Sequence, residues 1–363
     1  MLKDCVEVIR QGDESGNEMI VRFRLASGLE ILGLGTKNFY GGEWDLGPTW
    51  NYLVLAEEPF LVDTGRTGTS RSLIDMIAVA GFSLRDLAFV MLSHGHEDHD
   101  GGLAEIVALS GAKVRAHPIY KSLIGIHADK APEGVRKNFP PSCWHCPMPR
   151  SFTDENCTKY HKERSLLKIE NFGTPESRIA ENIHTHYLPG HSPDAVAVSL
   201  FNEAFLVGDN ILPDITPAPS REKFHRQLDG IVRPEDTNGE LVFGLKAYIR
   251  SLKKFGKLVI GLSDVLILPG HRLFYHNQWN NIDPISRIDG EILAGEPKEV
   301  KEIVVNHFRE SYIKGLGMHM AENEIMSHLE LLLDCGDVQQ IDETTYAASG
   351  SNSFETVIKA LEP

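Results

Sequence analysis

Apolar residues recur with two different spacings along the first 270 residues, and these spacings predict alternating strands and helices. Residues 18–35 and 51–63 carry alternating or β-branched apolar stretches bounded by glycine, which is typical of strands. Residues 69–81 instead repeat apolar side chains at helical spacing. Further strands are expected at 87–92, 113–116, 196–201 and 204–207, helices at 103–109 and 241–255, and apolar segments follow at 258–262 and 265–268. This alternation predicts a mixed α/β sandwich.

The bulk composition is that of an ordinary globular protein. The 363 residues suffice for one large sandwich with an appendage or for two domains, and 42% are hydrophobic against 24% charged. No apolar run approaches the 18 residues of a membrane span, and charges interrupt the N-terminus where a signal peptide needs an apolar core. Five cysteines, an odd number, agree with a reducing compartment, so we expect a cytoplasmic protein. A formal net charge of −15 argues against a nucleic-acid partner.

The most distinctive polar segment follows the predicted strand at 87–92. It reads Ser-His-Gly-His-Glu-Asp-His-Asp-Gly-Gly over residues 93–102, and four of its side chains are metal-ligand types: His94, His96, Asp98 and His99. His94 and His96 share a face at the strand period of two, and the other two follow around the turn. Because buried imidazoles need a polar partner or a metal, this density predicts a metal site. The alternative is a solvated histidine-rich loop.

Three later segments repeat one order of apolar run, glycine turn and ligand-type side chain. They end at His191 (Tyr-Leu-Pro-Gly-His), Asp209 (Phe-Leu-Val-Gly-Asp) and His271 (Leu-Ile-Leu-Pro-Gly-His). A single match would be weak, but four segments in succession predict that strand-end loops deliver ligands to one face of a sheet.

Together these segments resemble the metallo-beta-lactamase superfamily over about residues 18–275, with hydroxyacylglutathione hydrolase (glyoxalase II) the most similar pattern. The resemblance implies an αββα sandwich with a dinuclear metal centre at one edge. It assigns His94, His96 and His191 to the first metal, Asp98, His99 and His271 to the second, and Asp209 to both. Asp63, in the segment Phe-Leu-Val-Asp-Thr-Gly at 60–65, matches an aspartate that lies behind the ligands and orients an imidazole.

The implied cofactors are two divalent ions, with Zn²⁺ expected and iron or manganese also compatible with imidazole and carboxylate ligands. Two such metals can share a hydroxide that attacks a small ester-like substrate, namely a thioester, a lactone or a related acyl compound. Asp98 and Asp209 are then the expected catalytic residues, with Asp98 a candidate proton acceptor.

Three alternatives stay open at this stage. His96 stands where flavo-diiron relatives carry glutamate, which favours hydrolysis over oxygen reduction, but a mononuclear iron persulfide dioxygenase would keep the same histidines. A metal-dependent phosphodiesterase or ribonuclease is a further alternative. A non-enzymatic module with this fold would be expected to have lost ligands, and all seven are present. Neither a Gly-x-Ser-x-Gly elbow nor a phosphate-binding glycine loop competes with the metal motif.

A long insertion at about 117–181 separates the first ligand segment from the second. Its position between two ligand strands predicts a substrate-covering lid, and the alternatives are a surface elaboration or a homodimer contact. Cys143, Cys146 and Cys157 within it predict a reduced cysteine cluster, with a second zinc site as the alternative. Outside the ligand set, the candidate substrate contacts are Tyr40 and Trp44 in a loop that flaps over the metals in lactamase relatives, and His117, for which a capping or core role is the alternative.

We expect residues 1–285 to form the catalytic domain and residues 286–363 to form a C-terminal helical region. Apolar spacing predicts helices at 289–310 and 322–334, followed by a small hairpin from residue 336. This order resembles the winged-helix-like tail of some superfamily members. Arg309, Tyr312 and Lys314 could reach an anionic substrate group from this region, and plain surface charge is the alternative.

Overall fold

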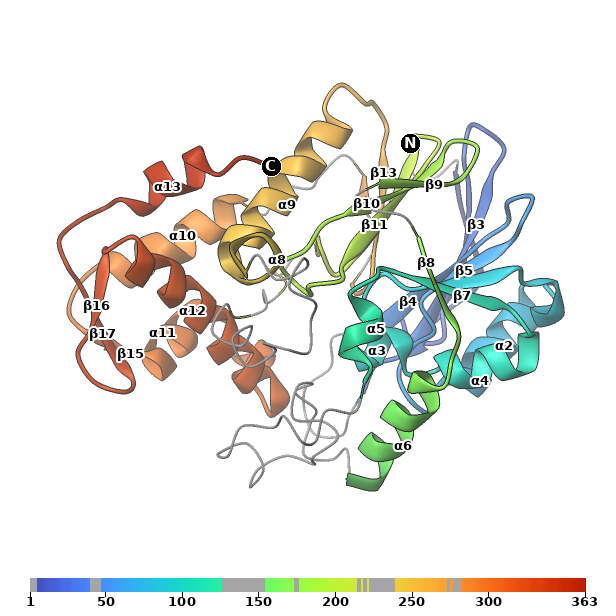
Figure 1. The fold of residues 1–363 in the computed structure, drawn as a ribbon, viewed down its shortest axis with the longest axis horizontal. Coiled ribbons are helices and arrows are strands. Elements are labelled where there is room, and N and C mark those ends of the chain that lie inside the picture. Colours follow the sequence, from blue (N-terminus) through green and yellow to red (C-terminus); the bar gives the residue numbers. More distant parts are fainter. Residues whose placement is uncertain are drawn as a thin grey trace.

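A computed structural model describes residues 5–39, 47–125, 154–172, 176–213, 217, 221, 239–272, 275–276 and 282–363. Two large β-sheets lie at its centre, helices cover their outer faces, and a helical region with a third sheet follows (Figure 1). Among the described residues, no helix combines the length and apolar character needed to cross a membrane.

The first sheet contains eight strands in sequence order: β1 (Val6–Arg10), β2 (Ile20–Arg24), β3 (Glu30–Lys37), β4 (Pro48–Val54), β5 (Phe60–Val62), β6 (Phe89–Met91), β7 (Lys113–Ala116) and β8 (Ile169–Asn171). Strands β1 to β5 pair antiparallel, whereas β5 to β8 pair parallel. The parallel half includes β6, which leads into the predicted metal motif.

The second sheet runs in the order β14 (Tyr275–His276), β13 (Leu266–Pro269), β12 (Ala204–Gly208), β11 (Val196–Leu200), β10 (Ile183–Tyr187) and β9 (Glu176–Ala180). Strands β12 and β13 pair parallel, so their carboxyl ends reach the same edge. The loops that follow these two strands carry Asp209 and His271.

Side-chain alternation along the strands explains the layered core. In β5, Phe60 and Val62 contribute to the apolar cluster between the sheets, whereas Leu61 contributes to the cluster beneath the outer helices. In β12, Leu206 points between the sheets and Phe205 packs on the opposite side. Each central strand is therefore buried on both faces, which accounts for its continuous apolar sequence.

Helices cover both outer faces, which confirms the predicted α/β sandwich (Figure 1). Helices α2 (Ser70–Val79) and α4 (Leu103–Ser110) pack on the first sheet, and α9 (Gly244–Val259) packs on the second. The remaining short elements of this part are η1 (Leu84–Asp86), α3 (Glu97–Asp100), α5 (Tyr120–Leu123), α6 (Asp154–Ser165) and α8 (Gly239–Val242).

The C-terminal region packs on α9 and shares its apolar cluster. It comprises α10 (Ile282–Leu293), β15 (Lys298–Glu299), α11 (Val300–His307), η6 (Glu310–Tyr312), α12 (Leu316–Asp334), β16 (Val338–Gln340), β17 (Thr345–Ala348) and α13 (Phe354–Ala360). The prediction of a single helix at 289–310 is wrong, because the chain leaves the helical conformation between α10 and α11. Gly295 has a φ of 90°, and Pro297 lacks the amide hydrogen that a continuing helix needs. Helix α10 runs across the expected domain boundary at 285/286.

The described ends of the insertion extend both sheets, since β8 is an edge strand of the first and β9 of the second. Helix α6 lies between them and α5 in the sequence. The proposed lid falls largely on residues 126–153, outside the described residues, as do Cys143 and Cys146. Cys157 on α6 is buried and disulfide-bonded, so the predicted reduced cluster is wrong at this cysteine.

Candidate metal centre

Every predicted ligand lies at the end of a strand or in the turn after it. His94 and His96 follow β6, and Asp98 and His99 lie in α3, the single helical turn that begins at Glu97. The other three ligands follow β10, β12 and β13 in the second sheet, at His191, Asp209 and His271. The structure brings all seven side chains together from both sheets.

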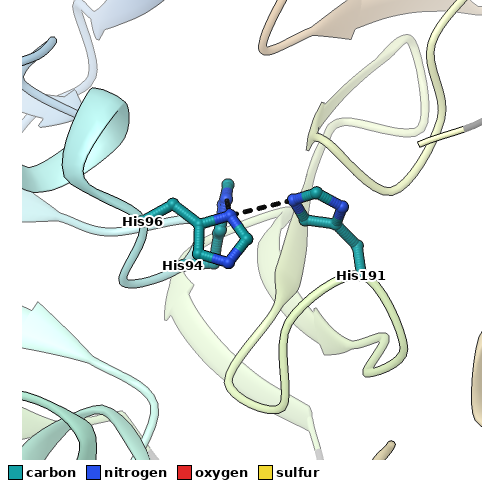
Figure 2. A group of neighbouring side chains, drawn as sticks. All are labelled: His94, His96 and His191. Atoms are coloured by element: carbon teal, nitrogen blue, oxygen red, sulfur yellow. Dashed lines mark hydrogen bonds between the residues drawn. The ribbon is translucent and has the colours of Figure 1, made fainter. Parts of the chain in front are cut away.

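The first group of three imidazoles is compact. Nδ1 of His96 lies 3.0 Å from Nε2 of His94 and 3.1 Å from Nε2 of His191. Figure 2 shows the rings of His96 and His191 facing one another from opposite sides of the site. All three ligand atoms lie within 4.8 Å of one another, a spacing at which one ion can contact all of them.

The second group comprises Asp98, His99 and His271, again with all ligand atoms within 4.8 Å. Nε2 of His271 lies 3.1 Å from Oδ2 of Asp98 and 3.3 Å from Nε2 of His99. Asp209 lies between the groups. Its Oδ1 is 3.3 Å from His99 Nε2, and its Oδ2 is 3.5 Å from His191 Nε2 and 3.3 Å from His271 Nε2.

Hydrogen bonds behind the ligands fix their orientation. Asp63 accepts from the backbone amide of Ser93 at 2.8 Å and from its hydroxyl at 2.7 Å, and its Oδ2 lies 2.9 Å from His99 Nδ1. His271 Nδ1 lies 3.1 Å from the carbonyl of Pro48. These contacts leave Nε2 of His99 and Nε2 of His271 aimed at the site, which agrees with the orienting role expected of Asp63.

A residue that sequence reasoning missed also contacts the ligands. The side-chain amide of Asn38, just after β3, donates to Oδ2 of Asp98 at 3.0 Å, and Asn38 is buried. No local pattern marks this asparagine, because the contact joins residues 60 positions apart.

Glycine is required at the rim of the site. A Cβ on Gly270 would lie 2.3 Å from Asp209 Oδ1 and 2.8 Å from His99 Cε1. Gly208, with φ of 51°, has Ser93 on its other side, 2.9 Å from where a Cβ would lie. The two glycines of the Val-Gly-Asp and Pro-Gly-His segments therefore let backbone approach the ligands closely.

The charges of the site divide between its two halves. Burial and the neighbouring imidazoles lower the pKa of His94, and burial together with His191 lowers the pKa of His96 to about 3, so both rings are neutral and offer lone pairs. Burial also opposes a charge on His271, yet the carboxylates of Asp209 and Asp98 raise its pKa to about 9. The pKa of His99 is raised in the same way.

This donor set fits divalent cations. The raised pKa values of His99 and His271 favour their protonated forms beside the carboxylates of Asp98 and Asp209, and a cation can replace those protons. Neutral imidazoles with carboxylates suit zinc, iron or manganese. Gly270 leaves the space beside the Asp209 carboxylate open, because a side chain on this residue would collide with that carboxylate. The residues therefore fit the metals that the sequence predicts.

Of the three candidate substrate contacts near the metal motif, the structure describes only His117. Tyr40 and Trp44 lie outside the described residues. His117 is buried, its ring stacks on Tyr187 at 4.2 Å with an interplanar angle of 8°, and its Nδ1 accepts from the amide of Ile119 at 3.3 Å. These contacts hold His117 in the core, and its contact with substrate stays a prediction.

Of the three C-terminal candidates, two lie near a ligand segment and one is exposed. The ring of Tyr312 lies 5.0 Å from the guanidinium of Arg272, the residue after His271, and 6.0 Å from that of Arg309. The structure thus brings Tyr312 and Arg309 beside the chain segment that carries a ligand. Lys314 is exposed.

Comparisons with known proteins agree with this geometry. The family model described as the metallo-beta-lactamase superfamily matches residues 44–271, more than half of the chain. A metallo-beta-lactamase family protein from Thermus thermophilus has a similar fold, with a TM-score of 0.60 and 21% identity over 89% of this chain and 99% of that one. A beta-lactamase domain protein from Burkholderia ambifaria matches at a TM-score of 0.56 and 17% identity, over 91% of this chain and 92% of that one. The chain belongs to the metallo-beta-lactamase superfamily.

Proposed function

We propose that this protein is a metal-dependent hydrolase that cleaves a small ester-like substrate at a dinuclear centre. The observation that carries the proposal is the placement of Asp209, whose two oxygens lie 3.3–3.5 Å from nitrogens of both ligand groups. A carboxylate in this position can contribute to both ions of a two-metal site. Two divalent ions bound here would supply a hydroxide at neutral pH and polarise the carbonyl under attack.

The protein's own residues have distinct roles in this proposal. His94, His96 and His191 would hold one ion, and Asp98, His99 and His271 the other, with Asp209 contributing to both. Asp63 holds the Nδ1 proton of His99, so that Nε2 is the ligand atom. Asp98 would accept the proton of the nucleophilic water, and the amide of Asn38 donates to its carboxylate.

The substrate class is an acyl compound such as a thioester or lactone, as expected for a glyoxalase II-like enzyme. Histidine at position 96 favours hydrolysis over oxygen reduction, because flavo-diiron relatives carry glutamate there. The segment after His191 differs from the glyoxalase II pattern, since Asp194 replaces a glycine. Asp194 is buried and hydrogen-bonded to the hydroxyl of Ser192, so it acts on loop structure rather than on substrate.

The test combines metal analysis with a substrate panel. We expect two divalent ions per chain and turnover of one thioester or lactone, and we expect His96→Ala and Asp209→Ala to lower kcat/KM by at least about 10³-fold. His319→Ala, at an exposed histidine of α12, is the matched control and should keep full activity. One iron per chain with oxygen uptake on a persulfide, or turnover confined to phosphodiesters, would refute the proposal.

A further inference from the structure

Helix α6, from the insertion, places a buried arginine against the metal motif. Arg164 is 1% exposed, and its Nη1 donates to Oδ2 of Asp100 at 2.6 Å. The same nitrogen lies 3.4 Å from the carbonyl of Gly95. Asp100 follows the last ligand of the motif, and Gly95 separates its first two ligands. One guanidinium therefore contacts the motif at both ends.

Asp100 accepts from three side chains that come from two helices. Tyr120 of α5 donates to Oδ2 at 2.8 Å, Tyr160 of α6 donates to Oδ1, and Arg164 completes the set. Arg164 is itself held by α6, because Nη1 lies 2.5 Å from the Tyr160 hydroxyl and Nη2 donates to His161 Nδ1 at 2.9 Å. The Tyr160 ring also lies 4.1 Å from the guanidinium.

The motif is packed closely at the same point. A Cβ on Gly95 would lie 2.8 Å from the ring of Tyr120 and 3.1 Å from Oδ2 of Asp194. The short segment from Gly95 to Asp100 is thus enclosed by α5, α6 and the loop after His191. Through Gly95 and Asp100, Arg164 contacts the backbone segment that carries His96, Asp98 and His99.

A buried ion pair is a poor way to gain stability, because removing both charges from water costs about as much as their attraction returns. The Arg164–Asp100 ion pair is therefore better explained by the groups that it orients. The contacts of Arg164 are to backbone and side-chain atoms within two residues of metal ligands. Groups that hydrogen-bond the ligands themselves change metal affinity by about 10 to 100-fold, and a group one contact further out should change it by less.

We propose that Arg164 is a positioning residue for the metal centre, and that α6 is a brace for the ligand motif. The inference rests on the proposed metal-dependent function. Arg164 hydrogen-bonds residues adjacent to the ligands in the sequence, Gly95 and Asp100. It fixes the Gly95 carbonyl and the Asp100 carboxylate, and through them the directions of the imidazoles between these two residues.

The experiment measures metal affinity directly, by competition between the protein and a chromophoric chelator for Zn²⁺. The visible spectrum of the Co²⁺-loaded protein serves as a second readout, since it reports ligand geometry. We would compare Arg164→Met, Arg164→Lys, Tyr160→Phe and the double variant Asp100→Asn/Arg164→Met with the wild-type protein. The control is Asp289→Asn, which replaces one oxygen of a fully buried carboxylate that lies 2.7 Å from His328, between α10 and α12, with an amide group.

We expect Arg164→Met to bind Zn²⁺ up to about 10 times more weakly than the wild type, the lower end of the range for groups that hydrogen-bond ligands directly, and to alter the Co²⁺ spectrum. Arg164→Lys should lie between the two, because an ammonium keeps the charge but loses the planar fork of donors. The double variant should regain thermal stability, since no unpaired charge is left buried, but it should not regain affinity. Asp289→Asn should lower the melting temperature and leave Zn²⁺ affinity unchanged.

Folded Arg164→Met with wild-type affinity and spectrum would overturn the inference. So would a double variant with restored affinity, because Arg164 would then only neutralise Asp100. If Arg164→Met does not fold, wild-type affinity in both Arg164→Lys and Tyr160→Phe overturns it equally. Failure of the wild-type protein to bind metal is a separate result, which rejects the proposed function itself.

Discussion

A single added methyl group at Gly270 tests the metal centre without removing any ligand. The Cβ of Gly270→Ala would lie 2.3 Å from Oδ1 of Asp209, and real Cβ contacts essentially never fall below 3.0 Å. The carboxylate must therefore retreat by about 0.7 Å, the difference between these two distances. His99 Cε1, at 2.8 Å, must also give way, because it borders the same space.

The retreat is large on the scale of catalysis. A displacement of about 1 Å in an active site can cost about 10²-fold in rate, so we expect kcat/KM to fall by between about 10- and 100-fold. Asp209 approaches both ligand groups, and its movement should also lower the number of ions retained after gel filtration from two towards one. The fold itself should survive, because the closest contacts are to the side chains of Asp209 and His99 rather than to the backbone.

Gly290→Ala is the matched control. Gly290 lies on the exposed side of α10, and a Cβ there meets nothing within 4 Å. The same substitution should therefore raise the free energy of unfolding by about 1 kcal/mol, through helix propensity, and leave activity and metal content unchanged. Wild-type metal content and turnover in Gly270→Ala would refute the assigned position of Asp209 between the two groups.

Two further predictions concern protons in the metal-free protein. Burial raises the pKa of Asp194 to about 6, so the folded protein keeps a proton that the unfolded chain loses near pH 3.8, and stability falls as pH rises through this window. Asp194→Asn should raise the free energy of unfolding by up to about 3 kcal/mol at pH 8 and by little near pH 4, and equal gains in urea unfolding at both pH values would contradict this. The carboxylates of Asp209 and Asp98 raise the pKa of His271 to about 9 despite its burial, so Zn²⁺ binding at pH 7.5 should release protons. Calorimetry in buffers of different ionisation enthalpy measures this release, and a binding enthalpy that does not depend on the buffer would contradict the prediction.

The ligand set could be predicted from the sequence because its signals are local. Each ligand follows an apolar run, and in three cases a glycine turn marks the point where the strand ends. Convergence then follows from topology, since neighbouring strands such as β12 and β13 end at one edge of a sheet. Asp63 was predictable for the same reason, as it directly follows β5.

The second ring of contacts could not be predicted, because it depends on packing between distant segments. Arg164 lies in a strongly polar helix, and such a residue is normally exposed. Its burial follows from the docking of α6 against Asp100, 64 positions away. The helix predicted at 289–310 was wrong for a different reason. The apolar residues keep their helical spacing across Gly295 and Pro297, but the backbone does not remain helical there.

Two residues next to metal ligands have strained backbone conformations that contacts to strands or strand ends maintain. Asp63 and Arg272 both have φ of 65°, in the left-handed region that residues other than glycine occupy at a cost of about 1–3 kcal/mol. Each is held there by contacts to rigid strands or their ends: Asp63 by the amide and hydroxyl of Ser93, and the carbonyl of Arg272 by the Trp50 indole at 2.5 Å. These are the residues that orient His99 and follow His271. These contacts thus hold the two residues in a backbone conformation that costs free energy, next to the ligands that they position.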